Sequence, residues 1–273
     1  MNCFPLLILL SVLPLSAGEV EPAKLACGDA IPVEPGSVEI GLAAGFIQAN
    51  RAWDDQGFCD DRGGRYRQTD GAVGFVMGVV PDLDCGITSG YTRIDDHAMA
   101  EDGPEHGHGV TDVTLAAKWR FLDAGALHAV VQPILNIPTG GHLPENHIPT
   151  ISDHWSVGGM IIATWILAPV VVNVDAGTLR HLRKQDHQFL GEWLADLAIG
   201  WQITDWCQPE AELNYSRLHR MHEDLPDSDT WAVTTGLLFP TRWGRFALGV
   251  QQGLAGHNAD RTTMALGHWV RTF

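Results

Sequence analysis

Apolar and polar side chains alternate along residues 109–121, which read GVTDVTLAAKWRF. One set of alternate positions carries Thr111 and then a purely apolar series: Val113, Leu115, Ala117, Trp119 and Phe121. The interleaved set contains three charged residues: Asp112, Lys118 and Arg120. Because successive side chains of a strand point to opposite faces, the pattern predicts a β-strand with one apolar and one charged face.

A period of two recurs in twelve segments, which we expect to be strands. They cover residues 38–47, 69–80, 85–94, 110–121, 127–137, 153–166, 170–180, 190–201, 206–217, 230–239, 245–254 and 263–273. Most have the length of about 9 to 11 residues, or slightly more, that a tilted membrane strand needs. The longest apolar run, Val157–Val172, is too short for a spanning helix and contains Pro169, so it is better explained as two strands joined by a turn.

The connections between these segments alternate in length. Five are short (81–84, 122–126, 167–169, 202–205 and 240–244), and the six between them are longer (48–68, 95–109, 138–152, 181–189, 218–229 and 255–262). Strict alternation indicates an up-and-down meander whose long loops all lie at one end, which a Greek-key sandwich would not produce. The sequence therefore predicts an all-β fold: a twelve-stranded antiparallel up-and-down transmembrane β-barrel with short periplasmic turns and long extracellular loops.

Aromatic residues decide which face of this barrel meets lipid. They fall on the apolar set near strand ends, as expected for girdles at two membrane interfaces: Trp119, Phe121, Trp155, Trp165, Trp193, Trp201, Trp231 and Phe239. The polar set then lines the lumen: Glu39, Asp112, Lys118, Arg120, Asn173, Asp175, Glu192, Asp196, Glu210 and Glu212. Seven of these are acids and two are bases, so the lumen is expected to be either plugged and salt-bridged or a narrow wet pore that favours cations or polar neutral solutes.

Composition and the residues at the two chain ends indicate the compartment in which the protein resides. Residues 1–17 resemble a secretory signal peptide, residues 18–37 are expected to form a periplasmic N-terminal segment, and residues 38–273 the barrel. A net charge of −16 excludes nucleic acid as a partner. We expect the protein to reside in the outer membrane of a Gram-negative-type bacterium, where outer-membrane lipid surrounds it. The terminal aromatic Phe273 resembles the signal that the barrel-assembly machinery recognises.

Cysteines and histidines leave further possibilities open. Four cysteines remain after the signal segment, Cys27, Cys59, Cys85 and Cys207, which permit disulfides without specifying them. Histidines gather in the expected long loops beside acids, so a weak zinc, copper or nickel site is conceivable there, with these ligands: His106, His108, His219 and His222. No cofactor is expected.

Short motifs resemble a known family. The sequence GVTDVTLAAKWRF, followed by HAVVQPILNIPTG, is similar to the pattern Gly-x-x-Asp, Lys-x-Arg-Phe and Pro-Thr-Gly of outer-membrane proteins named for the meta-pathway (MetA-pathway) of phenol degradation. WDDQG at residues 53–57 resembles that family's Trp-Asp-x-x-Gly. The resemblance implies a twelve-stranded barrel that acts as a channel or transporter for small solutes, with aromatic or apolar compounds as the implied class.

Two other functional classes remain open. A secreted soluble β-protein that binds a ligand would also show alternation. A barrel lipid hydrolase would need a serine and a histidine together on the lipid-facing rim; Ser152, Ser156 and His154 lie near a rim, but Ser156 and His154 have lumen parity. The sequence therefore predicts no enzyme.

Overall fold

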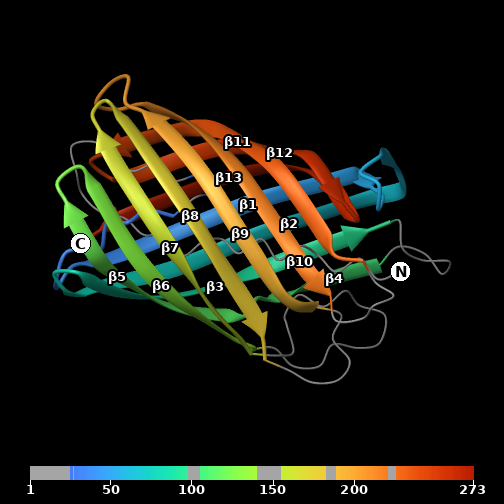
Figure 1. Ribbon diagram of the computed structural model, residues 1–273, viewed down its shortest axis with the longest axis horizontal. Coiled ribbons are helices and arrows are strands. Elements are labelled where there is room, and N and C mark those ends of the chain that lie inside the picture. Colours follow the sequence, from blue (N-terminus) through green and yellow to red (C-terminus); the bar gives the residue numbers. More distant parts are fainter. Residues whose placement is uncertain (1–24, 27, 98–104, 140–154, 183–188, 221–225) are drawn as a thin grey trace.

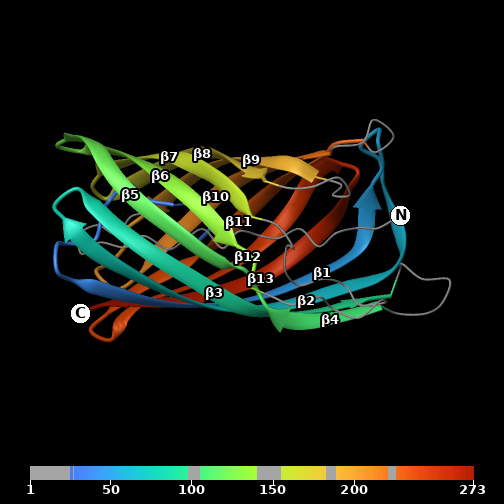
Figure 2. The same cartoon turned by 90° about the horizontal axis from the view of Figure 1, so that it is seen from below.

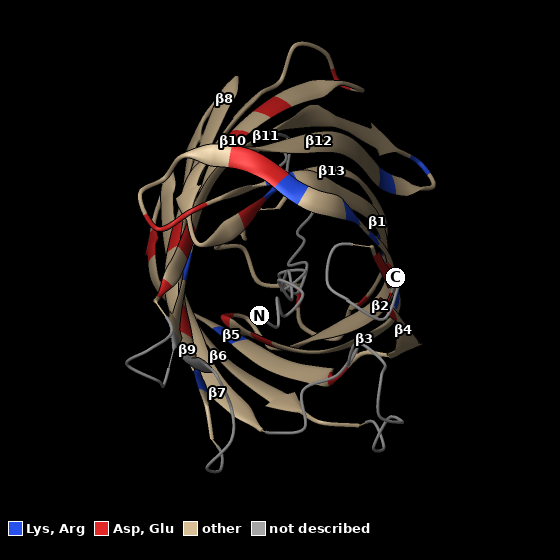
Figure 3. Cartoon of the chain, turned by 90° about the vertical axis from the view of Figure 1, so that its right-hand side faces the viewer, with Lys and Arg blue, Asp and Glu red and all other residues tan. Residues whose placement is uncertain are grey.

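The computed structural model describes residues 25–26, 28–97, 105–139, 155–182, 189–220 and 226–273. Its strands form one antiparallel sheet that closes on itself, and a view along the axis shows the ring (Figures 1 and 3). The strands are β1 (Val38–Trp53), β2 (Cys59–Val80), β3 (Leu83–Asp96), β4 (Glu105–Val110), β5 (Val113–Ala124), β6 (Leu127–Ile137), β7 (Ser156–Leu167), β8 (Val170–His181), β9 (Phe189–Trp201), β10 (Gln208–Arg220), β11 (Ser228–Thr241), β12 (Gly244–His257) and β13 (Ala259–Thr272). In these ranges no helix is long and apolar enough to cross a membrane.

Strand pairing confirms the predicted twelve-stranded barrel. β1 pairs with β2 on one side and with β13 on the other, which closes the ring. β4 and β5 both pair with β3 and are two pieces of one interrupted strand. At the interruption, Thr111 donates its backbone N–H to the carbonyl of Gly90 at 2.9 Å.

The interruption changes which face Val110 occupies. Alternation along 109–121 assigns Val110 to the same side as Asp112, but Val110 is 55% exposed on the outer face, whereas Asp112 is buried inside. An extra residue in one strand shifts the parity of everything before it. The charged face of this stretch therefore begins at Asp112.

The two ends of the barrel differ in their connections (Figure 1). At the turn end, β2 joins β3 through residues 81–82, β5 joins β6 through 125–126, β7 joins β8 through 168–169 and β11 joins β12 through 242–243. At the opposite end, here called the loop end, β3, β6, β8 and β10 end and β4, β7, β9 and β11 begin. The predicted short turns are present.

Two of the predicted long loops are instead mostly strand. β1 continues to Trp53 and β2 begins at Cys59, so only residues 54–58 connect them, and Asn258 alone joins β12 to β13. These strand extensions lie beyond the apolar belt, where outward side chains need not be apolar. A search for apolar alternation therefore could not detect them.

The WDDQG motif builds the β1–β2 connection. The Asp54 carboxylate accepts the backbone N–H groups of Gln56 and Phe58, at 2.9 and 2.8 Å, which holds the turn. Gly57 adopts a φ of 80°, a conformation that glycine tolerates best. Trp53 is buried against β12, where a β-carbon on Gly253 would lie 2.8 Å from its ring.

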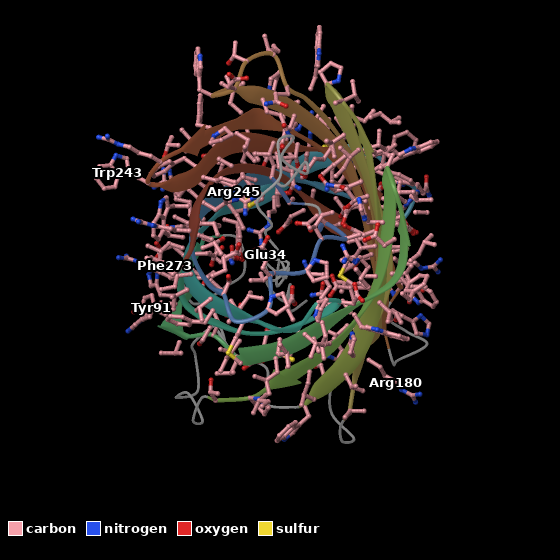
Figure 4. All side chains as sticks on the ribbon, turned by 90° about the vertical axis from the view of Figure 1, so that its left-hand side faces the viewer. Glu34, Tyr91, Arg180, Trp243, Arg245 and Phe273 are labelled. Carbon is pink, nitrogen blue, oxygen red and sulfur yellow. The ribbon has the colours of Figure 1, made fainter. Side chains whose placement is uncertain are left out.

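The outer face is apolar and aromatic. Trp119, Trp165 and Trp201 are more than half exposed on it. Figure 4 shows Trp243 and Phe273 pointing away from the ring, whereas Arg245 points into it. Arg271 shares the outward parity of Phe273 and lies over its ring, 4.9 Å from the ring centroid, which accommodates a cation near an interface. A closed barrel with this surface is an outer-membrane protein, which excludes the soluble alternative.

Candidate functional site: the barrel lumen

The described residues that precede β1 lie inside the barrel. These residues, 25–26 and 28–36, are here called the lumen segment, and they reach β1 through a turn in which Ser37 donates its N–H to the Glu34 carbonyl at 3.0 Å. Pro35 and Gly36, with a φ of 82° at Gly36, are the central residues that a type II turn prefers. Figure 4 shows Glu34 within the ring. We expected a periplasmic segment over 18–37, and the structure places its described residues from 25 to 36 in the lumen instead.

Acidic side chains of the wall bind the backbone of the lumen segment. Its N–H groups donate as follows: Leu25 and Ala26 to Glu212 (2.8 and 2.9 Å), Gly28 to Asp175 (2.8 Å), Ala30 to the Thr164 hydroxyl (2.8 Å) and Val33 to Asp84 (2.9 Å). A buried carboxylate needs donors of this kind. The physical reason for the position of the segment is therefore that its N–H groups solvate the acids of the lumen.

Lys118 is the basic residue at the centre of this arrangement. It is 2% exposed, and its Nζ donates to the Ile31 carbonyl at 2.9 Å. The same nitrogen lies 3.6 Å from Asp29 and 3.8 Å from Asp84. Lys118 thus offsets one acid of the segment and one of the wall.

One side of the lumen is apolar. β6, β7 and β8 contribute a buried cluster that packs against Ala30 of the lumen segment and consists of Val130, Ile134, Met160, Ile162 and Leu179. These residues have the same parity as the predicted polar set, so sequence alternation did not reveal that the inner face changes character around the ring. The sequence did contain a signal of this change, because residues 130, 134, 160 and 162 are apolar although they occupy inward-facing positions.

Next to this cluster, along β9, β10 and β11, the inner face is polar and hydrogen-bonded. Asn214 of β10 donates to Asp196 at 2.9 Å and accepts from Thr234 at 2.6 Å. Gln208 donates to Glu210 at 2.9 Å. The remaining predicted lumen residues are also buried: Glu39, which lies 3.5 Å from Arg245, and Asp112, Asn173 and Glu192.

Arg120 lies elsewhere. Its guanidinium binds Asp82 at 2.8 Å and lies 3.2 Å from Asp123, both at the turn end. Arg120 pairs with Val130, whose side chain is buried inside, so Arg120 keeps the inner parity expected from the sequence. It lies at the turn end of that face, where its contacts are with Asp82 and Asp123.

A clamp of ion-paired side chains, which alternation along the chain does not reveal, closes the wall at the loop end. The Arg62 guanidinium donates two bonds of 2.7 Å to Asp96 of β3 and one of 2.7 Å to Asp260 of β13. All three side chains lie in strand extensions that we expected to be loops. The clamp joins strands on both sides of β1 and β2.

The predicted metal ligands are not gathered. His106 and His108 both point outward from β4, and His219 lies on β10, on the other side of the ring, where its Nδ1 is 2.9 Å from Asp227. His222 lies outside the described residues. Within the described part of the chain, no three histidine, cysteine or acidic side chains are grouped to hold a metal. Cys59, Cys85 and Cys207 are unbridged, and Cys27 is not described.

Ser156 has a histidine neighbour. Its Oγ lies 2.8 Å from Nδ1 of His181 across β7 and β8. Ser156 is 1% exposed and faces the lumen, whereas hydrolysis of membrane lipid needs a serine on the lipid side. Ser152 and His154 lie outside the described residues.

Comparison with known proteins identifies relatives of the whole barrel. The family model described as "Putative MetA-pathway of phenol degradation" matches residues 38–271. The COG4313 outer membrane channel from Pseudomonas putida F1 superposes with a TM-score of 0.79 at 14% identity, covering 92% of this chain and all of that one. No curated protein matches the sequence.

Two autotransporter barrels superpose less closely. The translocator domain of NalP from Neisseria meningitidis gives a TM-score of 0.52 at 13% identity, covering 87% of this chain and 88% of that one. The β domain of BrkA from Bordetella gives 0.51 at 13% identity, covering 85% and 98%. At these identities the structural matches establish the fold.

Proposed function

We propose, since this chain belongs to the family described as "Putative MetA-pathway of phenol degradation", that it is an outer-membrane channel for small apolar or aromatic solutes. Short turns of outer-membrane barrels lie in the periplasm and long loops outside the cell. We therefore assign the turn end to the periplasm and the loop end to the exterior.

The apolar wall is the observation that carries this proposal. A porin for hydrophilic solutes has a polar interior, whereas here Val130, Ile134 and Ile162 line one side of the lumen. Binding sites for small organic molecules are mostly apolar with a few placed polar groups. The apolar wall, with Asn214 and Glu210 on the polar inner face of nearby β10, has this composition.

The lumen segment gives the passage its width in this proposal. Its N–H groups satisfy Glu212, Asp175 and Asp84, and Ala30 covers part of the apolar wall. In this proposal the lumen is filled and salt-bridged beside the segment, and the remaining passage is narrow for hydrated ions.

No catalytic role is included in the proposal. Ser156 and His181 support the junction of β7 and β8, where the hydroxyl and imidazole satisfy each other. Purified protein should therefore hydrolyse no lipid ester. Hydrolysis that disappears in Ser156→Ala would contradict this.

Assembly through the last strand is a further part of the proposal. Phe273 is 61% exposed on the outer face, and its backbone exchanges hydrogen bonds with Val38 at 2.8 and 3.1 Å. An exposed aromatic at this seam is available to the barrel-assembly machinery before β1 and β13 pair. Phe273→Ala should lower the amount of folded protein in the outer membrane.

Solute uptake tests the proposed function. Cells of a Gram-negative bacterium that make the wild type should take up radiolabelled toluene several-fold faster than cells with an empty vector. Ile162→Asn, which makes the apolar wall polar, should remove most of this gain. Gln251→Asn should retain it, because Gln251 of β12 donates to Asn214 and Thr234 on the polar part of the inner face. Equal uptake with and without the wild-type protein would overturn the proposal.

A further inference from the structure

Basic side chains gather on the outer face of β2, β3 and β4, toward the loop end. Cross-strand pairing brings together Arg67 with Asp95, Asp95 with His106, and Arg93 with His108. Arg65 lies beside this group, two residues from Arg67 on the same face of β2. Figure 2 shows these three strands side by side at this end. We call this group, Arg65, Arg67, Arg93, His106 and His108, the basic strip.

The carboxylate of Asp95 offsets only part of the charge in the basic strip. Asp95 lies 2.7 Å from His106 and 3.4 Å from Arg93. The hydrogen bond from His106 and the charge of Arg93 hold the pKa of Asp95 below its usual range, so it stays ionised at neutral pH. The strip thus contains three guanidinium groups and one carboxylate, which contacts only Arg93 among the arginines.

Two of the three arginines have no acid of their own. In the described ranges, no ion pair engages Arg65 or Arg67. Nε of Arg67 is buried and has no hydrogen-bond acceptor there. Arg93 is 68% exposed. A guanidinium in this situation favours an anion supplied from outside the chain.

The height of the strip on the barrel indicates what that anion is. Tyr91, which points outward beside the strip (Figure 4), and Phe75, Ile87 and Val73 below it belong to the exposed apolar belt. Aromatic residues such as Tyr91 mark the membrane interface. Arg93 lies two residues further along β3, or about 7 Å at the rise of a strand. This is the level of the lipid headgroups.

A pocket at this level has room for a headgroup. It has a volume of about 360 Å³ and is lined by Tyr91, Arg93, Asp95, His106, Gly107 and His108. Its lining thus combines Tyr91 on the lipid side with Arg93, two histidines and Asp95 above it. A lipid whose phosphate lies above its apolar chain would match this order of side chains.

The rest of the described rim does not repeat the pattern. On β10 and β12, Arg217 and His219 bind Asp227 at 2.8 and 2.9 Å, and His257 lies 3.1 Å from Asp229. Arg217 and His219 thus share one acid, and His257 has another. In a chain of net charge −16, the strip stands out because it places three arginines and two histidines on adjacent strands with one carboxylate among them.

We propose that the basic strip binds the phosphate groups of the anionic glycolipid that forms the outer leaflet of the outer membrane. Arg65, Arg67 and Arg93 supply fork-shaped donors for phosphate oxygens, and Tyr91 packs against the upper part of an acyl chain. The bound lipid anchors this side of the barrel at a fixed height. The inference does not depend on what passes through the lumen, so its failure would leave the proposed channel function untouched.

Lipid binding to purified protein tests the proposal. Native mass spectrometry in detergent would compare wild type with the triple variant Arg65→Gln, Arg67→Gln and Arg93→Gln, using purified lipopolysaccharide and its dephosphorylated form as probes. The double variant Arg180→Gln and Arg217→Gln removes outward arginines elsewhere and serves as the matched control. Retention of the heat-modifiable band on a denaturing gel verifies that each variant is folded.

We expect wild type and control to bind lipopolysaccharide alike and the triple variant to bind about a hundredfold more weakly, because each arginine near an anionic surface contributes about a fivefold factor. Dephosphorylation should abolish the difference between wild type and the triple variant. Equal affinity of wild type and triple variant, or equal loss in the control, would overturn the proposal.

Discussion

Gly78 of β2 touches the carbonyl oxygen of Glu34 so closely that no side chain fits between them. A β-carbon on Gly78 would lie 2.0 Å from that oxygen. Around this contact Gly36 donates to the Gly78 carbonyl at 2.9 Å, and Gly78 donates to the Ser37 carbonyl at 3.1 Å. The barrel wall is thus shaped at this point to hold the lumen segment.

Gly78→Ala should therefore displace the start of the lumen segment. Because the contact is with backbone, no flexible side chain can move aside. We expect the variant to fold and to show a larger single-channel conductance in a planar bilayer. Gly71→Ala is the matched control, because a β-carbon on Gly71 meets nothing within 4 Å. The same conductance in Gly78→Ala and Gly71→Ala would count against the contact.

The paired substitution Asp175→Asn and Glu212→Gln should loosen the segment without changing side-chain size. An amide oxygen is a weaker acceptor than a carboxylate, since hydrogen bonds to charged groups are roughly twice as strong. Hydrogen exchange of the amides of residues 25–33 should accelerate by at least about tenfold. Asp227→Asn, which changes an acid outside the lumen, should leave their exchange unaltered. Equal protection in all three proteins would show that the carboxylates do not hold the segment.

Lys118→Gln should make the channel more selective for cations. The change removes the positive charge near Asp29 and Asp84 and leaves both acids in the lumen. Reversal potentials in a salt gradient measure this directly, and a ring of acids favours cations. Arg120→Gln is the control, because Arg120 binds Asp82 at the turn end and should not affect selectivity. A shift of equal size in both variants would contradict the placement of Arg120.

Arg62→Ala should destabilise the loop end of the barrel. Breaking a buried ion pair by removing one partner costs about 3 to 5 kcal/mol, because the remaining charge is left uncompensated. The carboxylates of Asp96 and Asp260 would be left without the positive charge that compensates them. The temperature at which the heat-modifiable form is lost should fall, and Arg51→Ala, which removes an exposed arginine of β1, should change it little. An unchanged midpoint in Arg62→Ala would mean that the clamp is not stabilising.

The strands and their faces could be predicted because side chains that face lipid must be compatible with an apolar environment. Trp119 and Trp165 must be compatible with the membrane, so alternation along β5 and β7 is visible in the sequence. Beyond the bilayer, outward side chains need not be apolar. Trp53, Arg62 and Asp260 were consequently assigned to loops although they lie in paired strands.

The lumen segment could not be located from its side chains, because its main contacts are made by backbone N–H groups that every residue except proline carries. The sequence nevertheless contained an indirect signal. Seven predicted lumen acids faced two bases, and such an excess requires donors from elsewhere. Leu25, Gly28 and Val33 supply them, with Asp84 and Thr164 as wall partners that sequence reasoning missed.

Single-channel conductance with and without residues 25–36 tests the central claim most directly, namely that the lumen is the passage and the lumen segment sets its width. The wild type and a variant lacking these residues would be compared in the same planar bilayer and salt. We predict a small conductance for the wild type and a several-fold larger one for the variant. Identical conductance in the two proteins would contradict the claim.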